Sequence, residues 1–545
     1  MIRGKIKELL SQAIQSLQAE RIIPADLDVA VDVERPARAE HGDFSSNLAL
    51  GLARATGMPP RVLAERIIES LSPTDWVSKV EPAGPGFINF FLSHTWLYGT
   101  IQDIAMLGET FGRSSEGAGV RVQVEYGSAN PTGPLHVGNA RNIAYGDVLA
   151  SVLEAAGYSV DRENYLNDTG GQMERFGRSL EARYLEALGG KSELPEDGYA
   201  GPYLIDLGKE LASLEGPALV GRREDIQAWG LAKMIQAQAQ TLDRFGVKYD
   251  HWISERSLHD SGKIAAALER LGRSGHTYEA EGALWFRASQ FGHSQDRVLV
   301  RSGPHSRPTY LAADTAYLLD KLERGFDRLI YLWGADHHGA AENVTAVARA
   351  LGVEDRVEII LYQFVTFTGG PMSKRAGQIV TLDELIDEVG ADAARFTFLT
   401  RSADSPMVFD FDLVKAQSQE NPVYYVQYAH ARICSILRHG REQGVVLGAV
   451  AAALAELLHE SEYALMRKLA EYPENIQVAA KLRAPYRLTV YAQELAALFH
   501  AFYRDCRVVS DDRPLTQARL WLSEATRQVL ANVLSLMGVT APEVM

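Results

Sequence analysis

The sequence predicts a multidomain α/β protein with a central parallel sheet, a smaller α/β module before it and an all-α region after it. Three observations support this. Residues 122–157 read as a strand, a glycine-containing loop and a helix. Residues 329–333 are a continuous apolar run, typical of a strand buried on both faces. The pattern after residue 413 is helical almost to the end, and 545 residues suffice for several domains with separate cores.

Composition narrows the class of protein. Apolar residues make up 46% and charged residues 23%, as in ordinary globular proteins. Cys434 and Cys506 are too few for a disulfide scaffold, so we expect a reducing, cytoplasmic setting. We find no secretory signal and no apolar run of membrane-spanning length, and therefore expect no membrane association. The net charge of −15 argues against non-specific nucleic-acid binding, although a local RNA-facing surface remains open.

Residues 1–111 form the first predicted module, and the Gly/Ser-rich stretch 112–119 is a plausible linker. Asp43 or Ser45 is the expected N-cap of the second helix. The predicted elements are an N-terminal helix, an extended segment 29–36, helices from about Asp43 to Ala55 and from about Pro60 to Ser70, and a strand Phe87–Leu92.

The segment 122–157 predicts a ligand site. Its alternating strand ends near Tyr126, and a helical pattern with apolar residues three and four apart runs to Gly157. His136, Gly138 and Asn139 thus lie where a strand passes to a helix N-terminus, which offers backbone N–H groups and the positive end of the helix dipole. The loop is not a P-loop, because no Lys-Ser/Thr follows its glycines.

The next segments continue the parallel sheet around an insertion. A strand at 160–166 completes a βαβ unit, and residues from about 170 to 260 read as a mostly helical, acidic insertion. We expect the sheet to resume at 285–299. Residues 309–314 then lead into a helix.

The buried strand 329–333 ends in Gly334–Gly339, which contains His337 and His338. Adjacent histidines on a strand point to opposite faces and no spaced Cys or His joins them, so a zinc site is not expected. Polar residues at the carboxyl end of such a strand are better interpreted as ligand-facing. A strand at 357–361 follows, and then a basic, glycine-flanked turn at 369–377.

Two short motifs resemble the signatures of class I aminoacyl-tRNA synthetases. His136–Asn139 resembles the HIGH signature, and Pro371–Arg375 resembles KMSKS. The longer string Ser128–Gly138 is similar to arginyl-tRNA synthetases of bacterial type. Further stretches with the same likeness are 41–54, 84–92 and 195–203.

This resemblance implies three domains. They are an N-terminal module at 1–111 that contacts the tRNA corner, a class I Rossmann-like catalytic domain at 120–412 with a helical insertion at about 170–260, and an α-helical anticodon-binding domain at 413–545. It also implies an arginine–tRNA ligase that forms arginyl-adenylate from L-arginine and ATP and transfers arginine to tRNA(Arg). Further implied features are Mg²⁺ with the ATP, no zinc, a monomer, and activation of arginine only with tRNA bound.

The resemblance also implies roles for single residues. The catalytic residues would be His136, Gly138, Asn139 and Lys374. The ATP site would add Pro134, Asp336, Val365, Met372 and Ser373. Arginine would be bound by Glu125, Ser128, Asn130, His136, Tyr310, Asp314 and His338. Candidates for tRNA contact are Phe44 and Asn47 in the first module and Tyr424, Gln427 and Tyr428 in the last.

The chemistry fits these roles. Adenylate formation needs positioning and cancellation of negative charge, which His136 at a helix N-terminus and Lys374 on a glycine-flanked loop can supply. A guanidinium group carries five N–H donors in a rigid fork and is best held by carboxylates such as Glu125 and Asp314.

Three positions depart from the family pattern. Asn139 replaces the second histidine of HIGH, and Pro371 replaces the first lysine of KMSKS. Some family members use a glutamine to bind the amino group of arginine. Its position falls within Asp336–His338, where this chain has no glutamine.

Two alternatives are open. A cysteinyl-type ligase of the same class is disfavoured by the missing zinc cysteines and by the pair Glu125 and Asp314. A tRNA-binding paralogue with a dead site is disfavoured by His136, Gly138 and Lys374.

Overall fold

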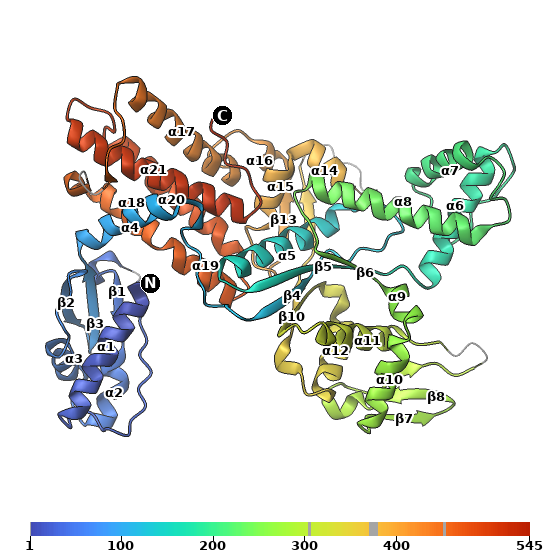
Figure 1. Ribbon diagram of the computed structural model, residues 1–545, viewed down its shortest axis with the longest axis horizontal. Coiled ribbons are helices and arrows are strands. Elements are labelled where there is room, and N and C mark those ends of the chain that lie inside the picture. Colours follow the sequence, from blue (N-terminus) through green and yellow to red (C-terminus); the bar gives the residue numbers. More distant parts are fainter. Residues whose placement is uncertain (1, 37, 304–306, 370–379, 451–453) are drawn as a thin grey trace.

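The computed structural model describes residues 2–36, 38–303, 307–369, 380–450 and 454–545. Figure 1 shows a central sheet with a helical domain on one side and two smaller lobes on the other. The N-terminal module lies below the helical domain, at the left of the view. No helix in the described ranges is long and apolar enough to cross a membrane.

The N-terminal module packs helices on an antiparallel sheet. Its strands pair in the order β1-β3-β2, and its core contains Phe44, Ile88 and Phe90. The elements are α1 (Ile2–Ala19), β1 (Phe44–Ser46), α2 (Leu48–Thr56), α3 (Pro60–Glu69), β2 (Val77–Ala83) and β3 (Phe87–Leu92). The predicted helix at about 60–70 and the strand 87–92 are therefore confirmed.

The predicted helix start at Asp43 is wrong. Residues Phe44–Ser46 form β1, and the helix begins only at Leu48. The cause is tertiary: Asp43 accepts a hydrogen bond from the Leu92 N–H at 2.8 Å, and Ser45 bonds to the Asn89 side chain. The predicted extended segment 29–36 contributes a single bridge, between Glu34 and Ser45.

The central sheet has five parallel strands in the order β11-β10-β4-β5-β6. The strands are β4 (Arg121–Glu125), β5 (Ser159–Leu166), β6 (His251–Ser254), β10 (Arg328–Gly334) and β11 (Val357–Tyr362). One face, with Val122, Val124 and Ile330, packs on α5 (Val137–Ala155). The other face, with Leu329 and Tyr331, packs on α11 (Tyr310–Glu323) and α12 (His338–Ala350).

The sheet does not resume at 285–299 as predicted. It resumes earlier, at β6, and the predicted strands belong to a separate antiparallel sheet β7-β8-β9. Between β7 and β8, Glu281 and Gly282 both have positive φ, so a two-residue turn of the primed kind pairs these strands with each other. The elements of this lobe are α9 (Glu255–Asp260), α10 (Lys263–Arg273), β7 (Thr277–Ala280), β8 (Ala283–Phe286) and β9 (Arg297–Val300).

The predicted helical insertion is present between β5 and β6. It forms a bundle around Phe176, Leu180 and Ile226. The helices are α6 (Gly171–Ala187), α7 (Pro202–Glu215) and α8 (Arg223–Arg244). Two of its side chains hold the loop after β4: Tyr203 OH donates to the Thr132 carbonyl at 2.6 Å, and Gln238 Nε2 donates to the Gly133 carbonyl at 2.8 Å.

The region after residue 413 is helical, as predicted. Its bundle contains α17 (Pro422–Glu442), α18 (Glu460–Ala470), α19 (Tyr472–Lys481), α20 (Tyr486–Asp505) and α21 (Arg513–Leu536). The connection from the sheet contains β12 (Val365–Thr368), α14 (Leu382–Val389), α15 (Ala391–Phe398), β13 (Met407–Asp410) and α16 (Phe411–Lys415). From the N-terminal side, α4 (His94–Leu107) packs on α18 and α21.

Arg395 on α15 ties these parts together. Its guanidinium donates to the carbonyls of Phe245 and Met537, each at 3.0 Å, and to Asp147 Oδ2 at 2.5 Å. The partners lie after the insertion helix α8, after the last helix α21, and in α5, so one buried cation satisfies acceptors from three segments.

Arg395→Ala should lower the free energy of unfolding by about 3–5 kcal/mol, because it leaves two buried carbonyls without their donor and takes from Asp147 the closer of its two cationic partners. Urea unfolding followed by circular dichroism measures this. Lys415→Ala is the control, since Lys415 makes an exposed pair with Glu388 that should contribute less than about 1 kcal/mol. Equal effects for the two variants would contradict the role of Arg395.

Candidate active site

The first candidate residue, His136, is the N-cap of α5. Its backbone is extended, and the Gly138 N–H donates to His136 Nδ1 at 3.1 Å. A neutral ring that accepts at Nδ1 carries its proton at Nε2, so Nε2–H remains available as a donor. Partial desolvation lowers the pKa of His136, which favours this neutral form. The position is therefore a neutral donor at a helix N-terminus.

Asn139 completes the same cap. Its Oδ1 accepts a hydrogen bond from the His136 N–H at 3.2 Å, giving a reciprocal capping box. The asparagine that replaces the second histidine of HIGH therefore helps to cap helix α5. Gly138 is needed for space, because a Cβ there would lie 2.8 Å from His136 Nδ1 and would push the ring out of place.

The residues just after the second motif are hydrogen-bonded to the residues around His136. The Val137 N–H donates to the Val380 carbonyl at 3.0 Å, and the Leu382 N–H donates to the Leu135 carbonyl at 2.8 Å. The segment that follows the second motif is therefore bonded to the loop that contains His136. Met372, Ser373 and Lys374 themselves lie outside the described residues.

Buried polar side chains cluster on the face of β4 opposite α5, and this cluster is called the pocket below. Glu125, the last residue of β4, is nearly inaccessible and forms an ion pair with Lys321 of α11 at 2.6 Å. Its other oxygen, Oε1, accepts from Ser128 Oγ at 3.3 Å and from Trp333 Nε1 at 3.4 Å. Sequence reasoning did not identify Lys321, because a lysine inside a helix carries no motif.

Asp314 belongs to the same pocket. Desolvation, and next the negative charges of Glu125 and Glu255, raise the pKa of Asp314 to about 7, whereas Lys321 opposes the rise. A nearby cation would stabilise the ionised form of such a carboxyl group. Tyr310, one helical turn earlier at the start of α11, is 68% exposed.

The remaining candidates lie on loops or at the ends of helices and strands. Asn130 Nδ2 donates to Gln172 Oε1 at 2.8 Å, and Ser128 Oγ accepts from the Tyr165 N–H at 3.2 Å. His338 begins α12, where it is exposed and lies 3.5 Å from Glu342. Asp336 is exposed in the turn after β10. Pro134 is half-buried in the loop before α5, and Val365 is half-buried at the start of β12.

The N-terminal module contains a groove of about 530 Å³. Asn47 is exposed and lines it, together with Arg35, His41 and Phe87. Phe44 does not: its side chain is fully buried in the core of the module, so the expectation that Phe44 contacts RNA is wrong.

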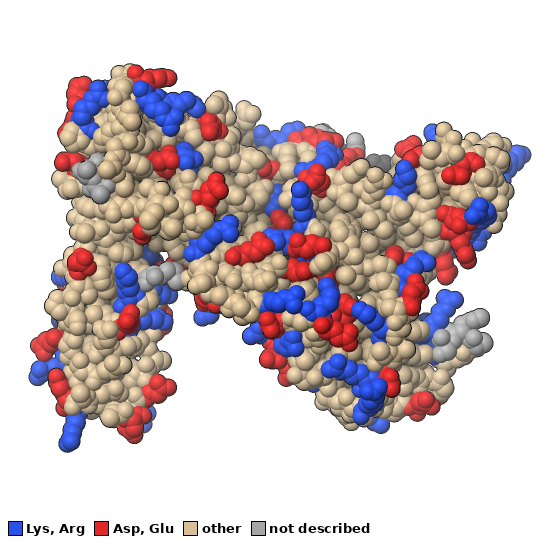
Figure 2. Space-filling view, viewed as in Figure 1, with Lys and Arg blue, Asp and Glu red and all other residues tan. Residues whose placement is uncertain are grey.

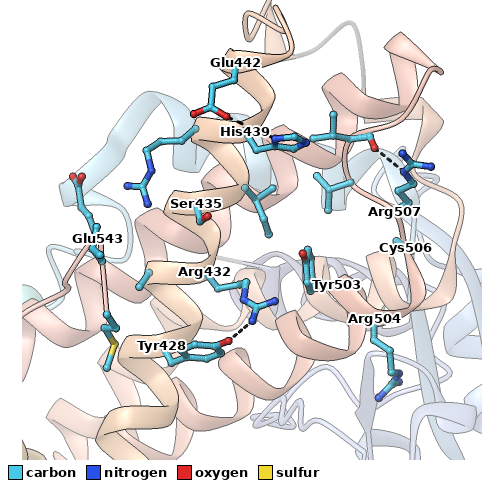
Figure 3. Close-up of a pocket in the computed structure, with 17 residues that line it drawn as sticks. Tyr428, Arg432, Ser435, His439, Glu442, Tyr503, Arg504, Cys506, Arg507 and Glu543 are labelled. Atoms are coloured by element: carbon cyan, nitrogen blue, oxygen red, sulfur yellow. Dashed lines mark hydrogen bonds and ion pairs between the residues drawn. The ribbon is translucent and has the colours of Figure 1, made fainter. Parts of the chain in front are cut away.

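A larger cavity of about 960 Å³ lies in the helical domain. Figure 3 shows Arg432 directed at the hydroxyl of Tyr428, with Tyr503 across from it and Arg504 and Arg507 on the opposite wall. On the face shown in Figure 2, Lys and Arg side chains gather near the end of α17 at the upper left, with Asp and Glu side chains among them. Arg432, Tyr503 and Arg507 were not foreseen, because only the fold brings α17 beside the end of α20.

The three tRNA candidates in this domain differ. The rings of Tyr424 and Tyr428 stack with centroids 6.1 Å apart, and both are half-buried. The Gln427 amide donates to Asp392 at 2.9 Å and to the Thr540 carbonyl at 3.0 Å. Gln427 therefore has internal partners and is a weaker candidate than the two tyrosines.

The described residues contain no group of three or more His, Cys, Asp or Glu side chains placed to hold a metal ion. Cys434 and Cys506 are buried free thiols.

Known proteins match this chain over nearly its whole length, and three family models match separate parts of it. Family models match residues 4–92 (arginyl tRNA synthetase N terminal domain), 101–197 (tRNA synthetases class I (R), catalytic domain) and 426–545 (DALR anticodon binding domain). An arginine–tRNA ligase of Heliobacterium modesticaldum is 48% identical, with 99% of each chain covered. One of Moorella thermoacetica is 49% identical, with 94% of this chain and 93% of the relative covered. The solved structure of Thermus thermophilus arginyl-tRNA synthetase superposes with a TM-score of 0.78 at 25% identity, with both chains fully covered.

Proposed function

The chain belongs to the arginyl-tRNA synthetase family and is an arginine–tRNA ligase, and from this premise we propose which of its residues perform the reaction. The substrates are L-arginine, ATP and tRNA(Arg). The observation that carries the assignment of residues is the buried pair of Glu125 and Asp314: Glu125 ends β4, and the loop that follows it leads to the N-terminus of α5.

We propose that ATP lies over the N-terminus of α5. His136 Nε2–H would donate to a phosphate oxygen, and the small Gly138 would let the nucleotide approach the backbone. Lys374 would neutralise the pyrophosphate as negative charge develops, a role taken from its motif. Pro134, Asn139, Asp336, Val365, Met372 and Ser373 complete the proposed ATP site.

The substrate arginine would enter past Tyr310 with its guanidinium group between Asp314 and Glu125. Two carboxylates around a planar cation can accept several of its N–H groups. Ser128, Asn130 and His338 are the proposed contacts of the other end of arginine, together with His136. The arginine carboxylate then attacks the α-phosphate of ATP, pyrophosphate leaves, and arginine passes to the terminal ribose of the tRNA, steps that depend mainly on positioning.

We propose that tRNA spans two surfaces. The groove with Asn47 in the N-terminal module would receive the tRNA corner. The cavity with Tyr428 and Arg432 in the helical domain would receive unpaired anticodon bases, since the tyrosine rings and arginines that line it can stack on bases. The proposed functional division remains 1–111, 120–412 and 413–545.

Three further features are proposals. Mg²⁺ would arrive with ATP, held mostly by phosphates and water with help from a carboxylate such as Asp336. The enzyme would act as a monomer in the cytoplasm, and the two free cysteines agree with a reducing compartment.

The KM for arginine should rise as the pH falls below about 7. The guanidinium group binds the ionised form of Asp314, whose pKa is about 7, so protons compete with arginine. Below that pH we expect KM to approach a tenfold rise per pH unit, with kcat changing less. Aminoacylation at saturating ATP and tRNA, from about pH 5.5 to 8, measures the profile. A KM that stays constant over this range would contradict the proposed role of Asp314.

The site assignment as a whole is tested by ATP–pyrophosphate exchange with each amino acid, with and without tRNA. Exchange with arginine that appears on addition of tRNA is the expected result. Exchange with another amino acid would contradict the proposal that Glu125 and Asp314 bind the guanidinium group of arginine. No exchange in any mixture, with tRNA binding intact, would favour a binder with a dead site.

A further inference from the structure

Helix α11 presents a row of charged and polar side chains to the sheet. Asp314, Tyr317, Lys321 and Arg324 follow one another at three- and four-residue spacing, so they share one face of the helix. Opposite them, Glu125 of β4 and Glu163 of β5 occupy paired positions of adjacent parallel strands. The two carboxylates have separate partners, Lys321 for Glu125 and Arg324 for Glu163.

Lys321 is completely enclosed. Its side chain is 0% exposed, and its ammonium lies 2.6 Å from Glu125 Oε2. The same nitrogen lies 3.7 Å from the centre of the Tyr331 ring and 4.1 Å from that of Tyr317. A lysine is rarely buried in this way without a charged partner, and here the partner is a residue of the proposed arginine site.

The ion pair leaves Glu125 with one oxygen for a ligand. Oε2 is taken by Lys321, whereas Oε1 accepts two long hydrogen bonds, at 3.3 and 3.4 Å, within the described part of the chain. Oε1 is therefore the oxygen of Glu125 with the longer contacts, and it is the one that we assign to the guanidinium group.

The pocket also carries an excess of acidic groups. The charged and titratable groups around Lys321, Glu125 and Asp314 are Glu163 and Tyr165 from β5, Tyr331 from β10, Glu255 from α9, Tyr317 from α11, and the cation Arg324 at the end of α11. Without the ammonium, Glu125 would be a desolvated carboxylate near Asp314 and Glu255. Carboxylates in such a group take up protons instead of remaining charged together.

We propose that Lys321 is a positioning residue for the arginine substrate: it keeps the Glu125 carboxylate ionised and holds it with Oε1 toward the guanidinium group. The proposal rests on the proposed arginine site. With Lys321 in place, arginine displaces at most the one proton of Asp314 when it binds. Without Lys321, arginine must also displace a proton from Glu125.

Lys321→Met tests this in the full-length enzyme, since methionine fills a similar volume without the charge. We expect KM for arginine to rise about tenfold or more near pH 6, and its dependence on pH to steepen from about tenfold toward a hundredfold per pH unit. At saturating arginine, kcat should change less than KM. Lys321→Arg retains a cation and should restore the shallower profile.

Lys263→Met is the matched control. Lys263 pairs with Asp320 of the same helix α11, but it is partly exposed and outside the pocket. It should show the wild-type KM and pH profile. A Lys321→Met enzyme that melts like the wild type and has the wild-type KM and pH profile would overturn the proposal.

A second measurement needs no variant. Calorimetric titration of the wild-type enzyme–tRNA complex with arginine near pH 6, in buffers of different ionisation enthalpy, counts the protons released. One proton or fewer supports the proposal, whereas two would show that Lys321 does not keep Glu125 ionised. Wild-type enzyme that fails to charge tRNA with arginine would instead contradict the proposed function itself.

Discussion

Glu125→Gln should lower kcat/KM for arginine by about 10²–10³-fold, mostly through KM. The substitution removes a carboxylate from the guanidinium pocket. It also leaves the Lys321 ammonium buried without its partner, 2.6 Å from where the charge was. An uncompensated buried cation next to the proposed position of the guanidinium group repels the substrate, so the loss exceeds that of one hydrogen bond.

Steady-state aminoacylation with arginine varied at saturating ATP and tRNA measures the effect. The KM for ATP should remain within a few-fold of the wild-type value, because ATP is proposed to lie on the α5 side. Glu358→Gln is the control: it is the same chemical change on β11, two strands away in the same sheet, at a half-buried pair with Arg483. Wild-type kinetics for Glu125→Gln would remove Glu125 from the arginine site.

His136→Asn should lower the rate of arginine activation by about 10²–10³-fold with little loss of stability. Asparagine is a favourable N-cap, so the amide oxygen can still accept from the Gly138 N–H. What disappears is the Nε2–H donor that we assign to a phosphate oxygen. Loss of one donor that acts in the transition state typically has an effect of this size.

ATP–pyrophosphate exchange in the presence of tRNA measures this step, and thermal unfolding checks the fold. The matched control is His459→Asn, because His459 caps α18 with the same capping-box geometry and lies in the helical domain. Unchanged exchange in His136→Asn would assign His136 to helix capping alone. Equal losses in both variants would indicate a general effect on folding.

Much of the architecture could be predicted because its signals are local. The strand at 87–92, the βαβ unit around His136 and the helices after residue 413 follow from periodicity and chain punctuation. The signature residues were also recognisable, since adjacent residues of one loop carry them. Errors arose where pairing is non-local: residues 44–46 became a strand against β3, and residues 283–300 joined a separate antiparallel sheet.

The sequence by itself determined the family and the order of the domains, and it was enough to propose Glu125, Asp314 and His136 as site residues, because motifs and spacing are properties of the chain. Only the tertiary structure decided what surrounds them. It buried Phe44, gave Gln427 internal partners and placed Lys321 against Glu125, which lies far away in the sequence. Burial and charge pairing depend on which segments meet in space. These neighbours in turn set the ionisation and the orientation of a carboxylate.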